Sequence, residues 1–327
     1  MNAYNKKSAP QIGIEIGSDT LKIAVANHGQ ITNFVTKRLA YGAVMDGKIS
    51  APNDMAEIIK ATLKEEGIRA TTCAVVLPPQ SVIGRNITMP LMSEEEYMLN
   101  LPFEFKDFIG KDGEKYLYDY VVKSVEGNSS EIFACAVLKS DVDLYYDLMH
   151  KAGLKLKRAI PPEMAWLSLI RSTEGAPKNL CIVDVGHSKT RVSIYGNGGF
   201  AMGREIEYAG RTLDEALGHY LGLDSFAART RKESNLNNCQ GSECCTDMYA
   251  DMATEITRTL KYYNDVNKNA IVRDLYYCGG CALIEPLRNA VIRSTGLTPH
   301  HISRLLPGVE GKDDIAICCA IAAGALM

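Results

Sequence analysis

The chain has 327 residues, a formal net charge of −3 at pH 7 and a sequence pI near 6.1. Its 36 basic residues are spread along the chain and are outnumbered by 39 acids, so nothing favours DNA or RNA as the main partner. The length exceeds what one compact core usually takes, which predicts two lobes.

The ten cysteines are scattered through this long chain rather than grouped as in a small secreted domain. Residues 1–10 are polar and lack the apolar core of a signal peptide. We therefore expect a disordered start at 1–10 and a cytoplasmic, reducing location.

The longest nearly apolar run is Ile315 to Met327, far short of the roughly 20 residues that cross a bilayer. Its Ala, Cys and Gly residues favour a buried last helix. The alternative, a helix lying on a membrane, normally requires a basic face, which this run lacks.

The first half reads as an α/β lobe interrupted by a more highly charged segment, 81–138, that is typical of a small inserted subdomain. Its expected elements, in chain order, are a hairpin at 12–26, a strand at 31–39, a helix at 52–66, a strand at 72–77, an inserted helix near 93–108, inserted strands at 116–124 and 132–138, a helix at 140–152, a strand at 154–160 and a helix at 161–170.

The second half repeats the strand and helix pattern. Its expected elements are a hairpin at 181–195, a strand at 200–207, helices at 210–221 and 247–263, a strand at 274–278, a further helix, a short strand near 301–302 and the last helix. The segment 225–241 and the overlapping CQGSECC stretch at 239–245 are expected to be irregular.

The two hairpins are near copies of each other. The first reads IGIEIGSDTLKIAV from Ile12, and the second reads CIVDVGHSKTRVSI from Cys181. Aligning them places Glu15 on Asp184, so that each turn carries an acid two residues before a glycine. Such a turn suits the presentation of backbone N–H groups to an anion, although a single copy is more typical of ordinary hairpin chemistry. Two copies together favour a clamp for one polyphosphate.

The order of hairpin, connecting helix, hairpin, then a strand ending in Gly-Gly resembles the actin, Hsp70 and sugar-kinase superfamily. The chain is most similar to the PilM family of type IV pilus assembly and next to FtsA. Four stretches carry this resemblance: the two hairpins, RNITMP from Arg85, and EITRTLKYYNDVNKNAIVRDLYYCGGCALIEPL from Glu255. An insert directly after the first lobe's strand is a feature of PilM and FtsA rather than of actin. The long linker and amphipathic helix that end FtsA are not expected here, which favours PilM.

The resemblance implies a duplicated, ribonuclease H-like, two-lobe ATPase fold, with a first lobe at 11–170 containing the insert 81–138 and a second lobe at 171–327. It also implies Mg²⁺ and ATP as cofactors, with the nucleotide between the lobes. The implied nucleotide-binding residues are Gly17, Ser18, Asp19, Thr20, Lys22, Gly186, His187, Ser188, Lys189, Thr190, Gly210, Arg231, Gly279, Gly280 and Ala282.

Among the implied site residues, Glu15 and Asp184 are the metal candidates. Asp184 and Glu163 are the catalytic candidates, Asp184 by orienting a water for slow hydrolysis. Glu15 stands where relatives carry aspartate, which puts hydrolysis in question. Ala228 stands where relatives carry a ribose-binding glutamate within Ala-Glu-x-x-Lys, and this substitution predicts weaker or altered nucleotide binding.

Three candidates have alternative interpretations. His187 either donates to a phosphate or is a solvated loop histidine, and Glu163 either faces the nucleotide or is an ordinary acid in a first helical turn. The CxxC formed by Cys278 and Cys281 suggests zinc only if a second matching pair lies close, and the sequence offers none with the usual spacing.

The implied function is that of an actin-like scaffold that binds the N-terminal tail of a PilN-type inner-membrane protein as an extended peptide, in a groove between the first lobe and the insert. Membrane contact would then be indirect, and self-association is a further possibility. The alternatives are a degenerate interaction module without nucleotide, an FtsA-like division protein and a small-molecule kinase, for which no acceptor site can be placed.

Overall fold

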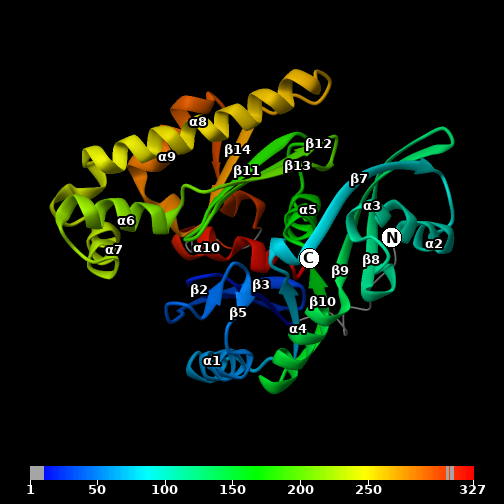
Figure 1. Ribbon diagram of the computed structural model, residues 1–327, viewed down its shortest axis with the longest axis horizontal. Coiled ribbons are helices and arrows are strands. Elements are labelled where there is room, and N and C mark those ends of the chain that lie inside the picture. The colour runs from blue at the N-terminus through cyan, green and yellow to red at the C-terminus, as the bar shows by residue number, and fades with distance from the viewer. Residues whose placement is uncertain (1–10, 307–308, 310–312) are drawn as a thin grey trace. The chain divides into compact units, whose positions relative to one another are not determined.

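The computed structural model describes residues 11–306, 309 and 313–327, and it divides into two compact units (Figure 1). The first unit runs to Glu174 and also includes Ile321–Met327, whereas the second comprises Gly175–Ala320. The prediction of disorder at 1–10 lies outside the described residues.

The first unit is built on a five-stranded sheet with the order β10-β6-β1-β2-β3. The first three strands in sequence pair antiparallel, whereas β6 and β10 join parallel to β1 and to each other. The strands are β1 (Ile12–Ile16), β2 (Thr20–Asn27), β3 (Gln30–Arg38), β6 (Thr72–Val76) and β10 (Lys155–Ile160), and a small hairpin of β4 (Val44–Met45) and β5 (Lys48–Ile49) follows β3.

Successive side chains of β1 point to opposite faces of this sheet, and helices cover both faces. Ile12 and Ile14 share a core with α1 (Pro52–Glu65) and α4 (Lys139–Lys151). On the other face, a Cβ at Gly13 would lie 1.9 Å from the Ala322 carbonyl oxygen of α10 (Asp313–Gly324). Residues Ala316–Ala325, apart from Cys318, are buried, which confirms the prediction of a buried last helix.

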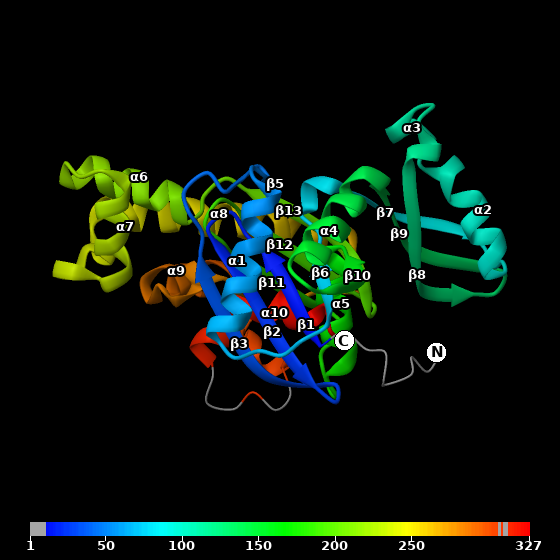
Figure 2. The same ribbon diagram turned by 90° about the horizontal axis from the view of Figure 1, so that it is seen from below.

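The insert is a three-stranded antiparallel sheet with the order β7-β9-β8, and helix α2 packs on one face (Figure 2). Its elements are β7 (Val82–Pro90), α2 (Glu94–Glu104), α3 (Lys106–Ile109), β8 (Tyr116–Glu126) and β9 (Ser129–Leu138). The sequence analysis missed β7, in which Gly84 and Pro90 weaken the strand pattern. Pro90 is tolerated because it ends an edge strand.

The second unit repeats the strand order of the first, as β13-β12-β11-β14-β15. Its parallel and antiparallel pairings also match, which confirms the duplicated fold expected from the two hairpins. Its elements are β11 (Leu180–Val185), β12 (Thr190–Gly196), β13 (Gly199–Ile206), α6 (Gly210–Leu221), α7 (Ser225–Ser234), α8 (Glu243–Val266), β14 (Asp274–Cys278), α9 (Glu285–Thr295) and β15 (Thr298–His301), and α5 (Pro162–Ser172) precedes them in the first unit.

The expectation of irregular structure at 225–241 is wrong. Asp224 caps α7 by accepting a hydrogen bond from the Ala227 N–H at 2.8 Å, and a 3-10 segment follows at Leu236–Gly241. The CQGSECC stretch is partly helical, because α8 already begins at Glu243. Many charged and small polar residues make α7 a poor match to a helical apolar pattern, although tertiary packing supports it.

We predict that Gly13→Ala lowers the free energy of unfolding by about 2–3 kcal/mol, because the added methyl group overlaps the Ala322 carbonyl oxygen. Urea unfolding followed by circular dichroism measures this loss. The matched control is Gly280→Ala, since a Cβ at Gly280 has no heavy atom within 4 Å. Equal stability of the two variants would show that α10 does not pack on β1 as described.

Candidate functional site

The two hairpin turns have the same geometry. The Gly17 N–H donates to the Thr20 carbonyl at 3.1 Å, and the Gly186 N–H donates to the Lys189 carbonyl at 3.1 Å. A Cβ on either glycine would lie within about 3.0 Å of that same carbonyl oxygen, so only glycine fits without a shift. The sequence repeat therefore corresponds to a repeated turn.

The acids of the two hairpins have different surroundings. In the first, both carboxylate oxygens of Glu15 lie close to the Lys22 ammonium, at 2.9 and 3.0 Å, and both side chains are less than one-fifth exposed. In the second, a Cβ at Gly279 would lie 2.5 Å from Asp184 Oδ1, so this carboxylate lies against the Gly-Gly loop. The charge of Glu15 is thus neutralised within its own hairpin.

The other polar residues of the first hairpin bond locally. The Thr20 hydroxyl donates to Asp19 Oδ2 at 2.9 Å, and the Asp19 carbonyl accepts from the Leu39 N–H at 2.8 Å. Ser18 lies in the turn between the two strands and is half-buried.

The second hairpin is held by the first turn of α6. The Gly210 N–H donates to the Gly186 carbonyl at 3.0 Å, and the Arg211 N–H donates to the His187 carbonyl at 2.7 Å. A Cβ at Gly210 would lie 2.8 Å from the Cys281 sulfur. The hairpin, the start of α6 and the Gly-Gly loop therefore meet at one place in the second unit.

The Gly-Gly loop depends on a left-handed residue. Gly279 has φ +90°, and its N–H donates to the Ile317 carbonyl at 2.9 Å while its own carbonyl accepts from Ala282. The side chains of Cys278 and Cys281, on either side of this loop, are buried. Within the described part of the chain, no three His, Cys, Asp or Glu side chains are grouped as metal ligands.

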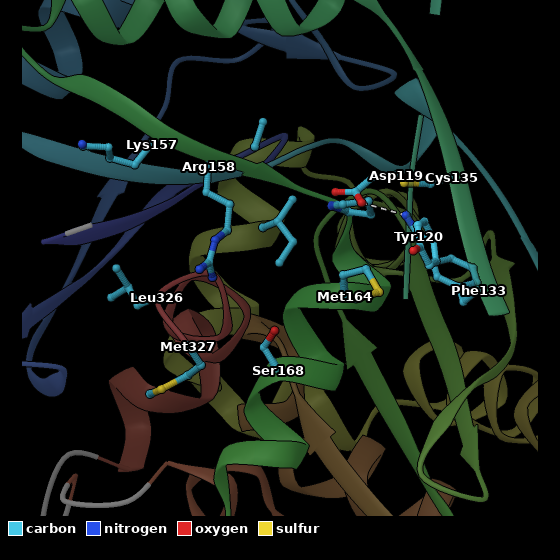
Figure 3. Close-up of a pocket in the computed structure, with 13 residues that line it drawn as sticks. Asp119, Tyr120, Phe133, Cys135, Lys157, Arg158, Met164, Ser168, Leu326 and Met327 are labelled. Carbon is cyan, nitrogen blue, oxygen red and sulfur yellow. Dashed lines mark hydrogen bonds between the residues drawn. The ribbon is translucent and has the colours of Figure 1, made fainter. Parts of the chain in front are cut away.

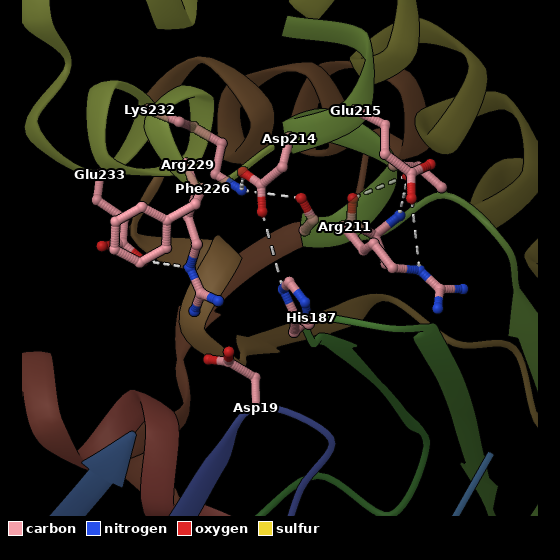
Figure 4. A network of polar contacts seen from close by, with 12 residues as sticks. Asp19, His187, Arg211, Asp214, Glu215, Phe226, Arg229, Lys232 and Glu233 are labelled. Atoms are coloured by element: carbon pink, nitrogen blue, oxygen red, sulfur yellow. Dashed lines mark hydrogen bonds and ion pairs between the residues drawn. The ribbon is translucent and has the colours of Figure 1, made fainter. Parts of the chain in front are cut away.

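A buried ion pair lies behind the second hairpin (Figure 4). Asp214 of α6 and Lys232 of α7 are 2 % and 4 % exposed, and their Oδ1 and Nζ atoms are 2.5 Å apart. Lys232 also donates to the Gly210 carbonyl at 2.9 Å. Burial raises the pKa of the Asp214 carboxyl above its ordinary value, while the charges of Lys232 and Arg229 oppose that shift.

Sequence reasoning missed both members of this pair. Ala228 is fully buried and lies four residues before Lys232 on the same face of α7. The basic residue of α7 that contacts Asp214 and Gly210 is therefore Lys232. Arg231 is half-buried, and its carbonyl accepts from the Cys239 thiol at 3.2 Å. One feature of the sequence could have identified the pair. The apolar faces of α6 and α7 each contain a charged residue, as with Asp214 three residues before Leu217.

Glu163 lies in the first turn of α5, in the first unit, whereas Asp184 belongs to the second unit. The charge of Glu163 acts on Cys135 of the insert. Burial raises the pKa of the Cys135 thiol to about 12, with smaller contributions from the carboxylates of Asp119 and Glu163. Cys135 is therefore protonated at neutral pH.

The first unit carries a pocket of about 670 Å³ whose lining residues the sequence did not identify. Its lining comes from β8, β9, β10, α5 and the residues after α10 (Figure 3), and comprises Asp119, Tyr120, Phe133, Cys135, Lys157, Arg158, Ala159, Ile160, Pro161, Met164, Ser168, Leu326 and Met327. Arg158 is fixed there by a bond from its guanidinium to the Ala325 carbonyl at 3.3 Å.

The duplicated sheets, the paired glycine turns and the insert after β6 define a protein of the actin-like ATPase fold. The chain belongs to the family of the type IV pilus assembly protein PilM, whose model matches residues 13–310. The family and the fold inferred from the sequence are therefore confirmed.

Solved structures share this fold. A chain described as part of the PilM-PilN type IV pilus biogenesis complex is 19% identical, with a TM-score of 0.82 and 97% of each chain covered. The ethanolamine utilization protein EutJ from Carboxydothermus hydrogenoformans is 13% identical, with a TM-score of 0.64 over 97% of this chain and 89% of its own. Within the described residues, no helix has both the length and the apolar character of a membrane span.

We predict that Lys232→Met lowers the free energy of unfolding by about 3–5 kcal/mol at pH 8, because it leaves the Asp214 carboxylate buried without its partner. The carboxyl would then bind a proton more tightly in the folded than in the unfolded state. The loss is therefore full above the raised folded pKa and shrinks as the pH falls through it.

Urea unfolding at pH 8 and pH 5 measures this effect. Lys37→Met is the matched control, because Lys37 and Glu65 form an exposed ion pair that is worth at most about 1 kcal/mol. A loss in Lys232→Met no larger than in the control, or one independent of pH, would contradict the prediction.

Proposed function

We propose that this protein is a nucleotide-binding scaffold of type IV pilus assembly that binds the N-terminal tail of a PilN-type inner-membrane protein. It would act on the cytoplasmic side and contact the membrane through that partner. The observation that carries the proposal is the pocket between the insert and β10. The complex described above, in which a PilM is joined to a PilN, supports the identity of the partner.

The pocket suits an extended peptide because two sheet edges border it. β8 lies at one edge of the insert sheet and β10 at one edge of the larger sheet, and both line the pocket. Backbone N–H and C=O groups at an edge strand can pair with an added strand, which provides affinity without dependence on sequence. A peptide would therefore bind as an extended segment along one of these edges.

The side chains of the pocket supply specificity. In Figure 3, Asp119 reaches the pocket from the insert, Arg158 from β10 and Met164 from α5. Phe133, Met164 and Ile160 provide apolar surface for an anchoring side chain, while Arg158, bonded to the Ala325 carbonyl just after α10, is a cation. Desolvation among these walls raises the pKa of Asp119, although the side chain remains open to solvent on one side.

The nucleotide part of the proposal is supported by the second hairpin, the start of α6 and the Gly-Gly loop. These bring the Asp184 carboxylate and the turn of the second hairpin together without intervening side chains at Gly186 and Gly279. Asp184 would hold Mg²⁺, which would supply positive charge to neutralise the phosphates. The Glu15 carboxylate is already paired with Lys22, so the first hairpin is the weaker candidate for the metal.

We predict that Met164→Glu weakens binding of a PilN-type tail peptide at least tenfold, or about 1.4 kcal/mol, because a charge replaces apolar pocket surface. Fluorescence polarisation with a labelled tail peptide measures the affinity. Met45→Glu, which makes the same change at an exposed site in β4 outside the pocket, should bind as the wild type does. Equal weakening in both variants, or no binding by the wild type, would refute the peptide site.

We predict that the wild-type protein binds magnesium–ATP with a saturable heat in calorimetric titration, and that Asp184→Asn reduces the magnesium dependence of that binding. Absence of heat at millimolar nucleotide would instead favour an interaction module without nucleotide. The Glu15–Lys22 pair is the observation that would support that alternative.

A further inference from the structure

The side chains of the second hairpin turn do not all face the same partner. Thr190 is fully buried, and its hydroxyl donates to the Tyr208 carbonyl at 2.7 Å. The Lys189 ammonium forms an ion pair with Glu207 at the end of β13. Two of the four polar side chains of this turn thus have partners in the second unit. His187 is another of the four.

The main chain of His187 is held by a hydrogen bond, and its ring faces a carboxylate. Its carbonyl accepts from the Arg211 N–H at 2.7 Å, and its ring Nδ1 lies 3.9 Å from Asp214 Oδ2. The His187 side chain is 23% exposed, whereas the Asp214 side chain is 3% exposed (Figure 4). One ring nitrogen therefore faces a buried carboxylate while part of the ring remains open to solvent.

Asp214 cannot easily turn away from His187. Its other oxygen is 2.5 Å from the Lys232 ammonium, which also donates to the Gly210 carbonyl. Three segments of the second unit, namely the hairpin, α6 and α7, are thus tied together through one carboxylate. A buried pair of this kind carries a large desolvation cost and does not by itself indicate a stabilising role.

In an imidazole ring, the partner of one nitrogen influences whether the other nitrogen is a hydrogen-bond donor or an acceptor. A carboxylate facing Nδ1 favours a proton on that nitrogen and stabilises the doubly protonated ring, in which Nε2 is also a donor. A phosphate oxygen is a suitable acceptor for such a charge-assisted hydrogen bond. In the first hairpin, Ser18 occupies the position equivalent to His187 and carries no comparable charge.

We propose that Asp214 is a positioning residue that orients His187 to contact the terminal phosphate of a nucleoside triphosphate bound at the second hairpin. This inference rests on the proposed nucleotide binding. It predicts that the protein distinguishes a triphosphate from a diphosphate through this one side chain, because the rest of the hairpin offers backbone amides to either nucleotide.

The test compares affinities for magnesium–ATP and magnesium–ADP by calorimetry, together with thermal unfolding of each variant. His187→Ala should weaken ATP binding about tenfold, as expected for loss of one charge-assisted hydrogen bond, and change ADP binding less than threefold. His219→Ala is the matched control, because His219 is exposed in the last turn of the same helix that carries Asp214 and should leave both affinities unchanged.

Two variants test the positioning role of Asp214. Asp214→Asn keeps an acceptor for Lys232 but removes the charge that faces His187, and the double variant D214N/K232M replaces the ion pair altogether. Either should lower the ratio of ATP to ADP affinity toward that of His187→Ala. If one of these two variants fails to fold, the ratio of ATP to ADP affinity in the other variant decides the outcome.

The possible failures are distinguishable. If the wild type binds ATP and His187→Ala keeps the wild-type ratio of affinities, the inference is wrong while nucleotide binding stands. Equal weakening of ATP and ADP in the Asp214 variants would make Asp214 a structural residue only. If the wild type binds neither nucleotide, the proposed nucleotide binding is wrong, and the inference fails with it.

Discussion

The second hairpin depends on hydrogen bonds that it does not supply itself. The first N–H groups of any helix lack partners within that helix, and here two of them, from Gly210 and Arg211, bind the carbonyls of Gly186 and His187. The hairpin turn is therefore fixed by α6. Lys232 in turn fixes α6 to α7 through the Gly210 carbonyl and Asp214. These few contacts fix the hairpin turn and the Asp214 carboxylate relative to each other.

Duplication produced two equivalent frameworks that differ in their charges. The strand orders, the acid-to-base register and the glycine turns correspond in both units. In the first hairpin, Lys22 neutralises Glu15, whereas in the second, Arg191 pairs with Glu205 of β13 and leaves Asp184 beside the Gly-Gly loop. A single change of ion-pair partner thus makes the second hairpin the better candidate for holding a metal–phosphate group.

The sequence predicted features that have a local cause and missed those created by distant contacts. The hairpins have glycine turns, α1 has an apolar face and the last helix is a continuous apolar run, and the structure confirms these elements. Helix α7 was missed because its surface is highly charged, although packing of Ala228 and Lys232 holds it in place. The lining of the pocket could not be read from local patterns, since Asp119 and Arg158 come to line one pocket only after the insert and β10 have folded.

The position of the pocket explains how a scaffold of this fold can hold a partner segment. Edge strands are usually short, charged or covered, because unpaired backbone groups invite association with other chains. Here β8 spans eleven residues and exposes Leu117, Val122 and Val125, and its Asp119 and Tyr120 reach the pocket. Preformed edges do not need to be ordered on binding, so the entropy cost falls mainly on the incoming peptide. Apolar pocket walls and the fixed Arg158 would then select which peptide is bound.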